Sequence, residues 1–517
     1  MTARSAIHAP VPVLAGNDLI LAAVVLAVAN FLVVLDSTIA NVSIPHIAGG
    51  LAVSSTEGTY VITSYAVAEA ITVPLTGWLA KRFGTLRVFT TCIALFGFFS
   101  CLCGLANSLG TLILGRVFQG LAGGPLMPLS QTLLMQIFPK EKQGAAIGLW
   151  SMTTLLAPVL GPILGGGICD NWGWEYIFFI NIPIAAVCSV TALRLLRPFE
   201  TKILKEKMDF IGLLLLITWV SSLQLMLDEG KNYDWFESKY IWGLGITAAI
   251  GFAAFIIWEL THEKPIVNLR VFRHRGYAVS VLTISLAFGA FFGSVVLTPL
   301  WLQMYMGYTA SWSGFSTAAI GIFSMLASPI VAKFTQKYDL RILVFSGVMW
   351  LGLLTFVRSF NTTDMTYLQI ALPMLIQGFG IPFFFIPLTR LALVSVTPDE
   401  TASAAGLMSF MRTLSGAAAT SIVTTSWEDK TNVFRTDLVA RSLSPEQISV
   451  LIGDSSAYGQ GIAAQILEQM TQSQAVMLAT NQIFLIVAFT FSFAALAICF
   501  APKPGKASSL DESTPSH

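Results

Sequence analysis

The sequence predicts an all-α integral membrane protein in which two six-helix bundles are joined by two inserted helices, fourteen transmembrane helices in all. Of its 517 residues, 55% are hydrophobic and 11% are charged, whereas about 25% are charged in an ordinary soluble domain. Apolar stretches repeatedly exceed the roughly 20 residues that a helix needs to cross about 30 Å of hydrocarbon. A soluble core could not bury so much apolar surface.

Composition also excludes several functional classes. A net charge of +1 argues against nucleic-acid binding, and no basic tract interleaved with aromatic residues occurs. Five of the six cysteines fall inside apolar runs, so neither a disulfide framework nor a metal site is expected. The sequence contains no nucleotide-binding loop and no Ser/His/Asp constellation, and its five histidines avoid the centres of the spans. We therefore expect no enzymatic activity and no cofactor.

Short connections separate the fourteen predicted spans. Residues 1–17 contain no apolar run of their own, so we expect a cytoplasmic N-terminus without a cleaved signal peptide. Residues 502–517 form the expected cytoplasmic tail. The spans are expected at residues 18–46, 58–80, 88–107, 110–137, 144–168, 175–196, 210–228, 239–260, 277–304, 312–334, 342–358, 367–396, 402–426 and 476–501.

Lysine and arginine are unevenly distributed over these connections. Of the 29 such residues, most lie on the side of the two termini, and Arg116, Arg390 and Arg412 lie within spans. The opposite side holds only Lys231, Lys239, Arg358, Lys430, Arg435 and Arg441. The positive-inside rule therefore places both termini in the cytoplasm of a bacterial-type inner membrane.

A repeat at a fixed offset predicts that the two bundles arose by duplication. Gln119-Gly120 recurs as Gln377-Gly378, and Gly148-Leu149 recurs as Gly406-Leu407, both with an offset of 258. The alternative is that such short identities arise because all membrane helices look alike. Under the duplication, a bundle at 18–196 and a second at 277–501 form parallel repeats around a midplane site, and 210–260 holds the inserted pair.

One outer connection is unusually long. Residues 427–475 are polar, yet they show helix-like apolar spacing at Ile448, Leu451 and Ile452 and again at Ile462, Ile466 and Met470. This periplasmic segment is either a cap on its own bundle or a docking element for a partner.

Four ionisable residues stand out inside the membrane, where a charge costs about 3 kcal/mol on insertion scales and usually faces a cavity or a partner. Asp36 in span one and Arg116 in span four lie about 13 Å and 9 Å below the same surface at 1.5 Å per residue, so they can meet. Their interaction is either a proton switch or a permanent pair that orders the helices. Glu69 has no cation near it in sequence, and Arg412 is either its distant counterpart or an anion-binding group.

Span five is rich in glycine and proline. Pro158 and Pro162 interrupt its backbone ladder, and Gly161 and Gly165, followed by Gly166, remove side chains from one face. A GxxxG pair alone often serves only packing. With both prolines, we expect a bent helix at a moving interface.

The connection after span two gathers cations beside glycines. Gly77 lies at the end of span two, Arg82, Gly84 and Arg87 lie in the connection itself, and Gly84 is free to adopt a positive φ. Part of this charge serves topology. We also expect it to form a cytoplasmic gate whose cations engage acidic groups or helix ends in one state only.

Together these motifs resemble the major facilitator superfamily, specifically its drug:proton antiporters with fourteen spans, of the EmrB/QacA type. The run from Leu35 to Val42 is similar to that subfamily's first-helix signature, Arg116 with Gln119-Gly120 to its fourth-helix motif, and Gly161-Pro162 with Gly165-Gly166 to its antiporter motif. The resemblance implies proton antiport with Asp36 and Arg116 in the coupling region. Lys81 departs from the superfamily pattern, because an acidic residue is usual there.

The resemblance implies proton-driven export of hydrophobic or amphipathic drugs, with a periplasmic adaptor and an outer-membrane channel as partners and the proton gradient as the only energy source. Candidates for the substrate cavity are Gln119, Gln377 and Phe384. A dedicated exporter of one metabolite, such as a siderophore or fatty acid, is the first alternative. An importer and a membrane enzyme or sensor on the same scaffold are further alternatives.

Overall fold

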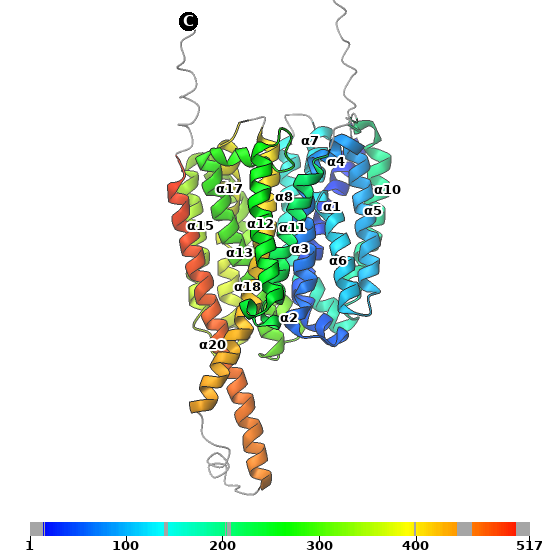
Figure 1. The fold of residues 1–517 in the computed structure, drawn as a ribbon. Helices are drawn as coiled ribbons and strands as arrows, with labels where there is room; N and C mark the ends of the chain where they lie inside the picture. The colour runs from blue at the N-terminus through cyan, green and yellow to red at the C-terminus, as the bar shows by residue number, and fades with distance from the viewer. Residues whose placement is uncertain are drawn as a thin grey trace, which may run out of the picture.

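The computed structural model describes residues 14, 16–138, 143–201, 203, 208–397, 400–441 and 457–502. These residues form helices joined by short connections, and Figure 1 shows them as a bundle from which one hairpin projects. We call the face on which α1 begins and α20 ends the terminal face, and the opposite one the hairpin face. Most of the predicted tails at 1–17 and 502–517, namely residues 1–13, 15 and 503–517, lies outside the described residues.

The first group of helices, which we call the N-half, contains six helical segments that run from one face to the other. We call each such segment a rod, whether it is one helix or two consecutive helices. Pro74 and Pro125 lack the amide hydrogen that would continue a helix, and the second and fourth rods are each divided close to one of them. The helices are α1 (Gly16–Leu51), α2 (Ser55–Gly58), α3 (Tyr60–Thr72), α4 (Thr76–Phe83), α5 (Thr85–Gly104), α6 (Leu109–Gly123), α7 (Leu126–Ile137), α8 (Gln143–Asn171), α9 (Tyr176–Phe179) and α10 (Asn181–Leu195).

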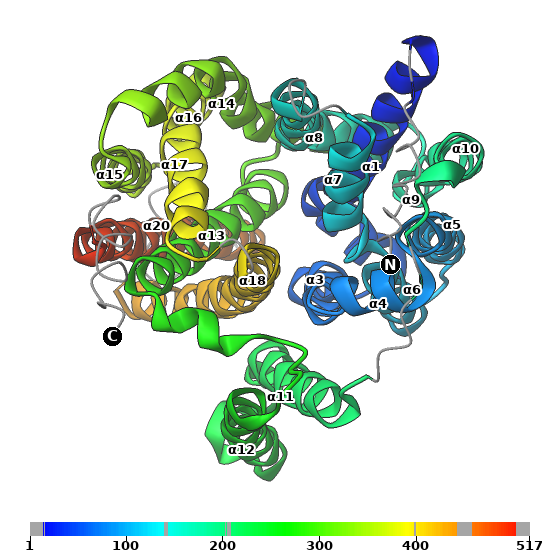
Figure 2. The ribbon, with the colours of Figure 1, turned by 90° about the horizontal axis from the view of Figure 1, so that it is seen from above.

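The second group, the C-half, also contains six rods. Its helices are α13 (Arg275–Met304), α14 (Ala310–Lys337), α15 (Leu340–Arg358), α16 (Tyr367–Gln377), α17 (Gly380–Val394), α18 (Thr401–Arg441) and α20 (Ala457–Ala497). Between the halves in sequence come α11 (Phe210–Glu229) and α12 (Lys239–Thr261). Figure 2 shows this inserted pair at the side of the molecule, with α11 against both α3 and α18 and α12 farther out.

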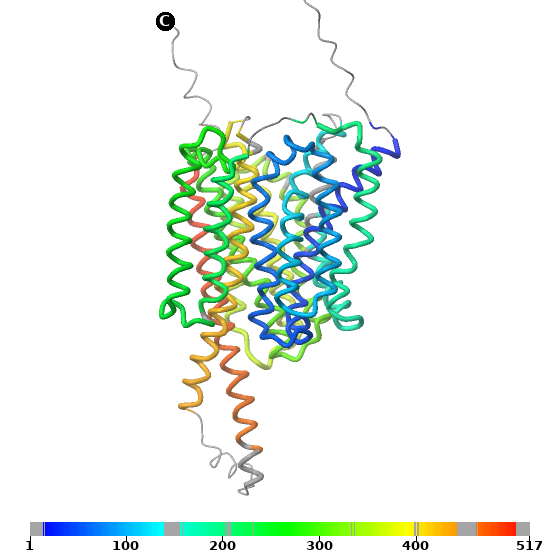
Figure 3. The backbone as a smooth tube through the Cα atoms, turned by 45° about the vertical axis from the view of Figure 1, so that its right-hand side comes forward, coloured from blue at the N-terminus to red at the C-terminus, as the bar shows by residue number. Residues whose placement is uncertain are grey.

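Ten helices of the described chain are long and apolar enough to cross a membrane by length and composition. The other four rods, α3–α4, α6–α7, α8 and α18, run beside them between the same two faces (Figure 3). All the secondary structure assigned to the described residues is helical, as an all-α membrane fold predicts. One buried apolar cluster lies wholly within the N-half, and a larger one joins α11 and the C-half to residues of α1 and α3.

The two halves are fastened together at the hairpin face. Asp170 at the end of α8 accepts hydrogen bonds from the backbone N–H groups of Ala310 (3.2 Å) and Ser311 (2.8 Å) in the first turn of α14. Gln303 Nε2 donates to the carbonyl of Val42 over 2.8 Å, and the Thr56 hydroxyl donates to Glu428 Oε2 over 2.5 Å. In this state the hairpin face is therefore closed.

The projecting hairpin is a continuation of two bundle helices, α18 and α20, beyond the hairpin face. Arg435 and Glu468 form an ion pair of 2.5 Å across it. Ile462, Ile466 and Met470, whose spacing predicted a helix, lie on α20 and are exposed. The other apolar triplet of the predicted segment, at 448–452, lies outside the described residues.

We expect Gly84→Ala to destabilise the protein by about 1–2 kcal/mol, because φ is +95° at this position and a side chain is strained there. A Cβ would also lie 2.5 Å from the Glu200 carboxylate. Thermal unfolding in detergent measures the effect. Gly77→Ala is the matched control, since Gly77 is helical with open space around it, and it should raise stability slightly. Equal effects of both changes would contradict the analysis.

Candidate functional site

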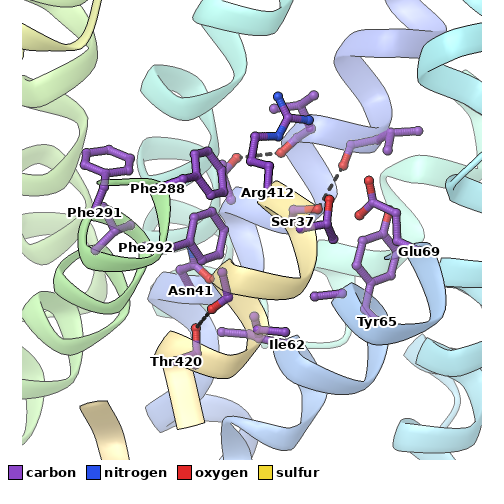
Figure 4. Close-up of a pocket in the computed structure, with 18 of the residues that line it drawn as sticks. Ser37, Asn41, Ile62, Tyr65, Glu69, Phe288, Phe291, Phe292, Arg412 and Thr420 are labelled. Atoms are coloured by element: carbon purple, nitrogen blue, oxygen red, sulfur yellow. Dashed lines mark hydrogen bonds between the residues drawn. The ribbon is translucent and has the colours of Figure 1, made fainter. Parts of the chain in front are cut away.

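A cavity of about 230 Å³ lies between the two halves at mid-height. Its walls are largely apolar and include five aromatic rings, and Figure 4 shows many of the side chains that line it. The aromatic members are Tyr65 of α3, Phe288, Phe291 and Phe292 of α13, and Phe385 of α17. Such a surface binds flat or flexible apolar molecules without demanding one shape.

Two opposite charges share this cavity. Glu69 projects into it from α3 and Arg412 from α18, so one charge comes from each half (Figure 4). They form no ion pair with each other, and within the described part of the chain the Glu69 carboxylate makes no hydrogen bond. The Arg412 guanidinium lies 5.4 Å from the ring centroid of Phe288 and 5.8 Å from that of Phe385. Arg412 Nη2 also lies 3.7 Å from the Met127 sulfur. Both expected charges thus face the same cavity, and neither is held in an ion pair with a described residue.

Asp36 and Arg116 do meet. Arg116 Nη1 donates to Asp36 Oδ2 over 2.5 Å, and both side chains are almost fully buried. Arg116 Nε also donates to the carbonyl of Val61 on α3 (3.0 Å), and the guanidinium lies 4.1 Å from the centroid of the Tyr65 ring. Arg116 and Tyr65 line the cavity, whereas Asp36 lies behind them.

Asn181 completes this cluster, although its role could not be inferred from its place in the sequence. Its Nδ2 donates to Asp36 Oδ1 over 2.7 Å and to Ser100 Oγ over 3.0 Å. Gln119 Nε2 donates to the same carboxylate oxygen over 3.1 Å, while its Oε1 accepts from Arg116 Nη1 over 2.8 Å. In the sequence, Asn181 stands at the start of an apolar run, in the segment from Phe179 to Pro183 that also fits the family pattern. Asp36 is therefore held by three donors from two helices.

The three residues expected to line the substrate cavity lie elsewhere. Gln119 serves the Asp36 cluster, and Phe384 is buried inside the C-half. Gln377 Nε2 donates to Thr355 Oγ1 over 2.9 Å. It is Phe385, the next residue along α17, that faces the cavity. Adjacent helical positions point about 100° apart, so the run of phenylalanines could not tell which one faces inward.

A second arginine, Arg358, is buried, although the sequence analysis placed it in an outer connection. Arg358, counted above among the outer connections, is 3% exposed at the end of α15. It donates to Ser294 (3.2 Å), Gln377 (3.3 Å) and Thr298 (2.6 Å) and lies 4.2 Å from the centroid of the Phe484 ring. No carboxylate of the described chain pairs with it. Ser294 stands at the repeat position of Asp36, with the offset of 258.

The glycines of α8 face two different helices. A Cβ on Gly161 would collide with Thr38 of α1, and one on Gly165 would come within 3.0 Å of the Ile39 carbonyl oxygen. Gly166 instead meets the backbone of Ala310 on α14, and Gly314 of α14 meets the Pro162 carbonyl. Pro158 lies within α8, but its side chain is outside the described part. The motif thus lets α8 pack closely on its own half and on the other half.

The glycine-containing connection at the terminal face has an acidic partner within its own half. Glu200, which follows α10, accepts hydrogen bonds from the backbone N–H groups of Leu86 and Arg87, both 3.1 Å long. The Arg87 side chain lies 3.7 Å from the same carboxylate. Arg82 is half-buried, and Gly77 is exposed on α4. In this state the connection therefore closes onto the N-half.

Arg116 belongs to a buried ion pair, whereas Arg412 belongs to none within the described residues. Removing the two arginines should therefore lower the stability of the protein by different amounts. We expect Arg116→Met to destabilise the protein by about 3 kcal/mol, because it leaves the buried Asp36 carboxylate without its cation. Arg412→Met, the matched control, breaks no ion pair and should cost far less. Thermal unfolding of both purified variants in detergent measures the difference. Equal losses would show that the Asp36–Arg116 pair does not dominate the local energetics.

Comparison with known proteins supports this description. The family model of the Major Facilitator Superfamily matches residues 26–420. The chain is 42% identical over 503 residues to the multidrug export protein EmrB of Haemophilus influenzae, covering 95% of this chain and 98% of that protein. It is 40% identical over 486 residues to the fatty acid resistance protein FarB of Neisseria gonorrhoeae, covering 93% and 95%.

A solved structure shares the fold. A bacterial homologue of the human lysosomal transporter Spinster, in an inward-facing and unoccupied conformation, superposes with a TM-score of 0.59 at 14% identity, covering 94% of this chain and 98% of that one. With most of its length matched by the family model and nearly all of it by relatives of about 40% identity, the chain belongs to the Major Facilitator Superfamily.

Proposed function

We propose that this protein exports lipophilic and amphipathic small molecules, drugs among them, in exchange for protons. The observation that carries this proposal is the presence of two opposite charges, Glu69 and Arg412, that form no ion pair inside a largely apolar cavity. Charges are expensive at this depth and usually mark a transport pathway. The relatives named for multidrug export support the same function.

The proposed cycle uses the two carboxylates differently. Glu69 faces the cavity, so it can exchange a proton with water there and bind a cationic substrate when ionised. Asp36 lies behind Arg116 and Tyr65, so it can take up a proton only if Arg116 releases it. A substrate that displaces Arg116 or neutralises Glu69 would then couple its own movement to that of the proton. The cycle needs no cofactor and no chemical step beyond proton transfer.

The distribution of lysine and arginine over the connections bears on how the protein is oriented and in which membrane it lies. We propose that the terminal face lies in the cytoplasm and that the membrane is the inner membrane, because the cationic connections lie mostly on that face. The closed hairpin face then represents the periplasmic side. In this state the protein would load substrate from the cytoplasm or the inner leaflet.

A dedicated exporter of one organic acid, such as a fatty acid or a siderophore, is the second candidate. The free guanidinium of Arg412, flanked by Phe288 and Phe385, suits a carboxylate with an apolar tail. The relative named for fatty acid resistance favours this alternative.

We also propose a periplasmic adaptor, and through it an outer-membrane channel, as partners. The hairpin of α18 and α20 projects beyond the bundle and exposes Ile462, Ile466 and Met470 on α20. Exposed apolar stripes on a helix suit packing against another helical element.

In vesicles, we expect Asp36→Asn to abolish transport driven by a pH gradient and Glu69→Gln to reduce it at least tenfold, because each removes a carboxylate that must gain and lose a proton. The assay follows a panel of lipophilic dyes and weak acids together with internal pH. Asp364→Asn, an exposed carboxylate, is the control. Movement of several unrelated compounds supports multidrug antiport, and movement of acids alone supports the dedicated exporter. Unchanged transport by Asp36→Asn would refute the coupling role.

Deleting residues 430–472 should leave membrane insertion intact but weaken adaptor capture, because it removes the projecting ends of α18 and α20. Co-purification of a tagged adaptor from cells that express both proteins measures capture, and yield in the membrane fraction controls for insertion. Unaltered co-purification would reject the hairpin as the docking element.

A further inference from the structure

The inserted helices carry a carboxylate at the point where the two halves meet. Asp228 lies in the last turn of α11, at the hairpin face. Its Oδ2 accepts a hydrogen bond from the Thr63 hydroxyl of α3 over 3.0 Å, and its Oδ1 accepts one from the Ser421 hydroxyl of α18. One side chain therefore bonds a helix of the N-half and a helix of the C-half at the same time.

Neighbouring groups reinforce this bridge. Gln224 Nε2, one turn back on α11, donates to Asp228 Oδ1 over 2.9 Å and to Ser421 Oγ over 2.5 Å. The Tyr60 hydroxyl, in the first turn of α3, donates to the Asp228 carbonyl over 2.7 Å. No cation of the described chain pairs with the carboxylate, so these neutral donors alone compensate its charge. Hydrogen bonds to an ionised acceptor are roughly twice as strong as neutral ones.

The two bonded helices are those that bear the free charges of the cavity. Thr63 lies six residues from Glu69 on α3, about 9 Å along the axis, and Ser421 lies nine residues from Arg412 on α18, about 13 Å. If the hairpin face is to open, the ends of α3 and α18 must move apart at this point. Thr63 and Ser421 cannot then both remain on one carboxylate.

We propose that Asp228 is a positioning residue for transport: it latches α3 to α18 at the hairpin face and so makes the inserted pair part of the access cycle. The latch rests on the proposed export function, in which each cycle opens this face once. It holds the closed state and must be released before substrate can leave.

Distance measurements test the latch directly. Spin labels would be placed at Asn107→Cys and Thr362→Cys, two exposed positions on the hairpin face of opposite halves, in the full chain with its native cysteines replaced by serine. Double electron–electron resonance in nanodiscs then measures the distances between the two labels, and the distance distribution gives the open and closed populations of this face. The variants are Asp228→Ala, Ser421→Ala and Thr63→Val, and the matched control is Glu237→Gln, an exposed acid in the α11–α12 connection.

We expect Asp228→Ala to raise the open population at least threefold, Ser421→Ala and Thr63→Val to raise it by smaller factors, and Glu237→Gln to leave it unchanged. A distribution unaltered by Asp228→Ala, or altered equally by Glu237→Gln, overturns the latch. If Asp228→Ala does not fold, the two hydroxyl variants decide the question by the same criterion. The measurement needs no substrate, so failure of the parent chain to move any drug would refute the proposed function without touching this result.

Discussion

The buried ion pair between Asp36 and Arg116 is the interaction around which the N-half is organised. Taking two charges out of water is repaid only when the geometry is good and the remaining donors and acceptors are satisfied. Here α6 supplies Arg116 and Gln119, α10 supplies Asn181, and the α3 backbone accepts from Arg116 at Val61. These contacts fix the positions of four helices, α1, α3, α6 and α10, relative to one another. They also keep Glu69 on α3 facing the cavity.

The two halves share a plan but not a charge distribution. The repeat position of Asp36 is Ser294, and that of Gln119 is Gln377, which also contacts a buried arginine. In the C-half, however, that arginine is Arg358 on α15, and its acceptors are neutral. The N-half cluster therefore holds a carboxylate beside its buried arginine, whereas no carboxylate of the described chain bonds the buried arginine of the C-half. Arg412 and Glu69, which form no ion pair, line the cavity between the two halves.

The depth of Asp36 and Arg116 could be predicted because rise per residue converts sequence position into height in the membrane. Their pairing was left open, since height says nothing about rotation around the helix. The same limit explains the errors. Phe384 was chosen where Phe385 faces the cavity, and Arg358 was assigned to a connection because it ends an apolar run. The role of Asp228 was not predicted from the sequence, because its partners come from helices remote in sequence.

The sequence by itself determined the membrane class, the order of the helices and some of the charged residues that are buried, Asp36 and Arg116 among them. These properties are local, because the free energy of moving a side chain from water into hydrocarbon depends mainly on its own chemistry and depth. Only the tertiary structure decided which charges pair, which aromatic rings enclose the cavity, and that the inserted helices bridge α3 and α18. Those outcomes depend on how each helix is rotated and tilted against its neighbours, and close packing between helices sets that rotation and tilt.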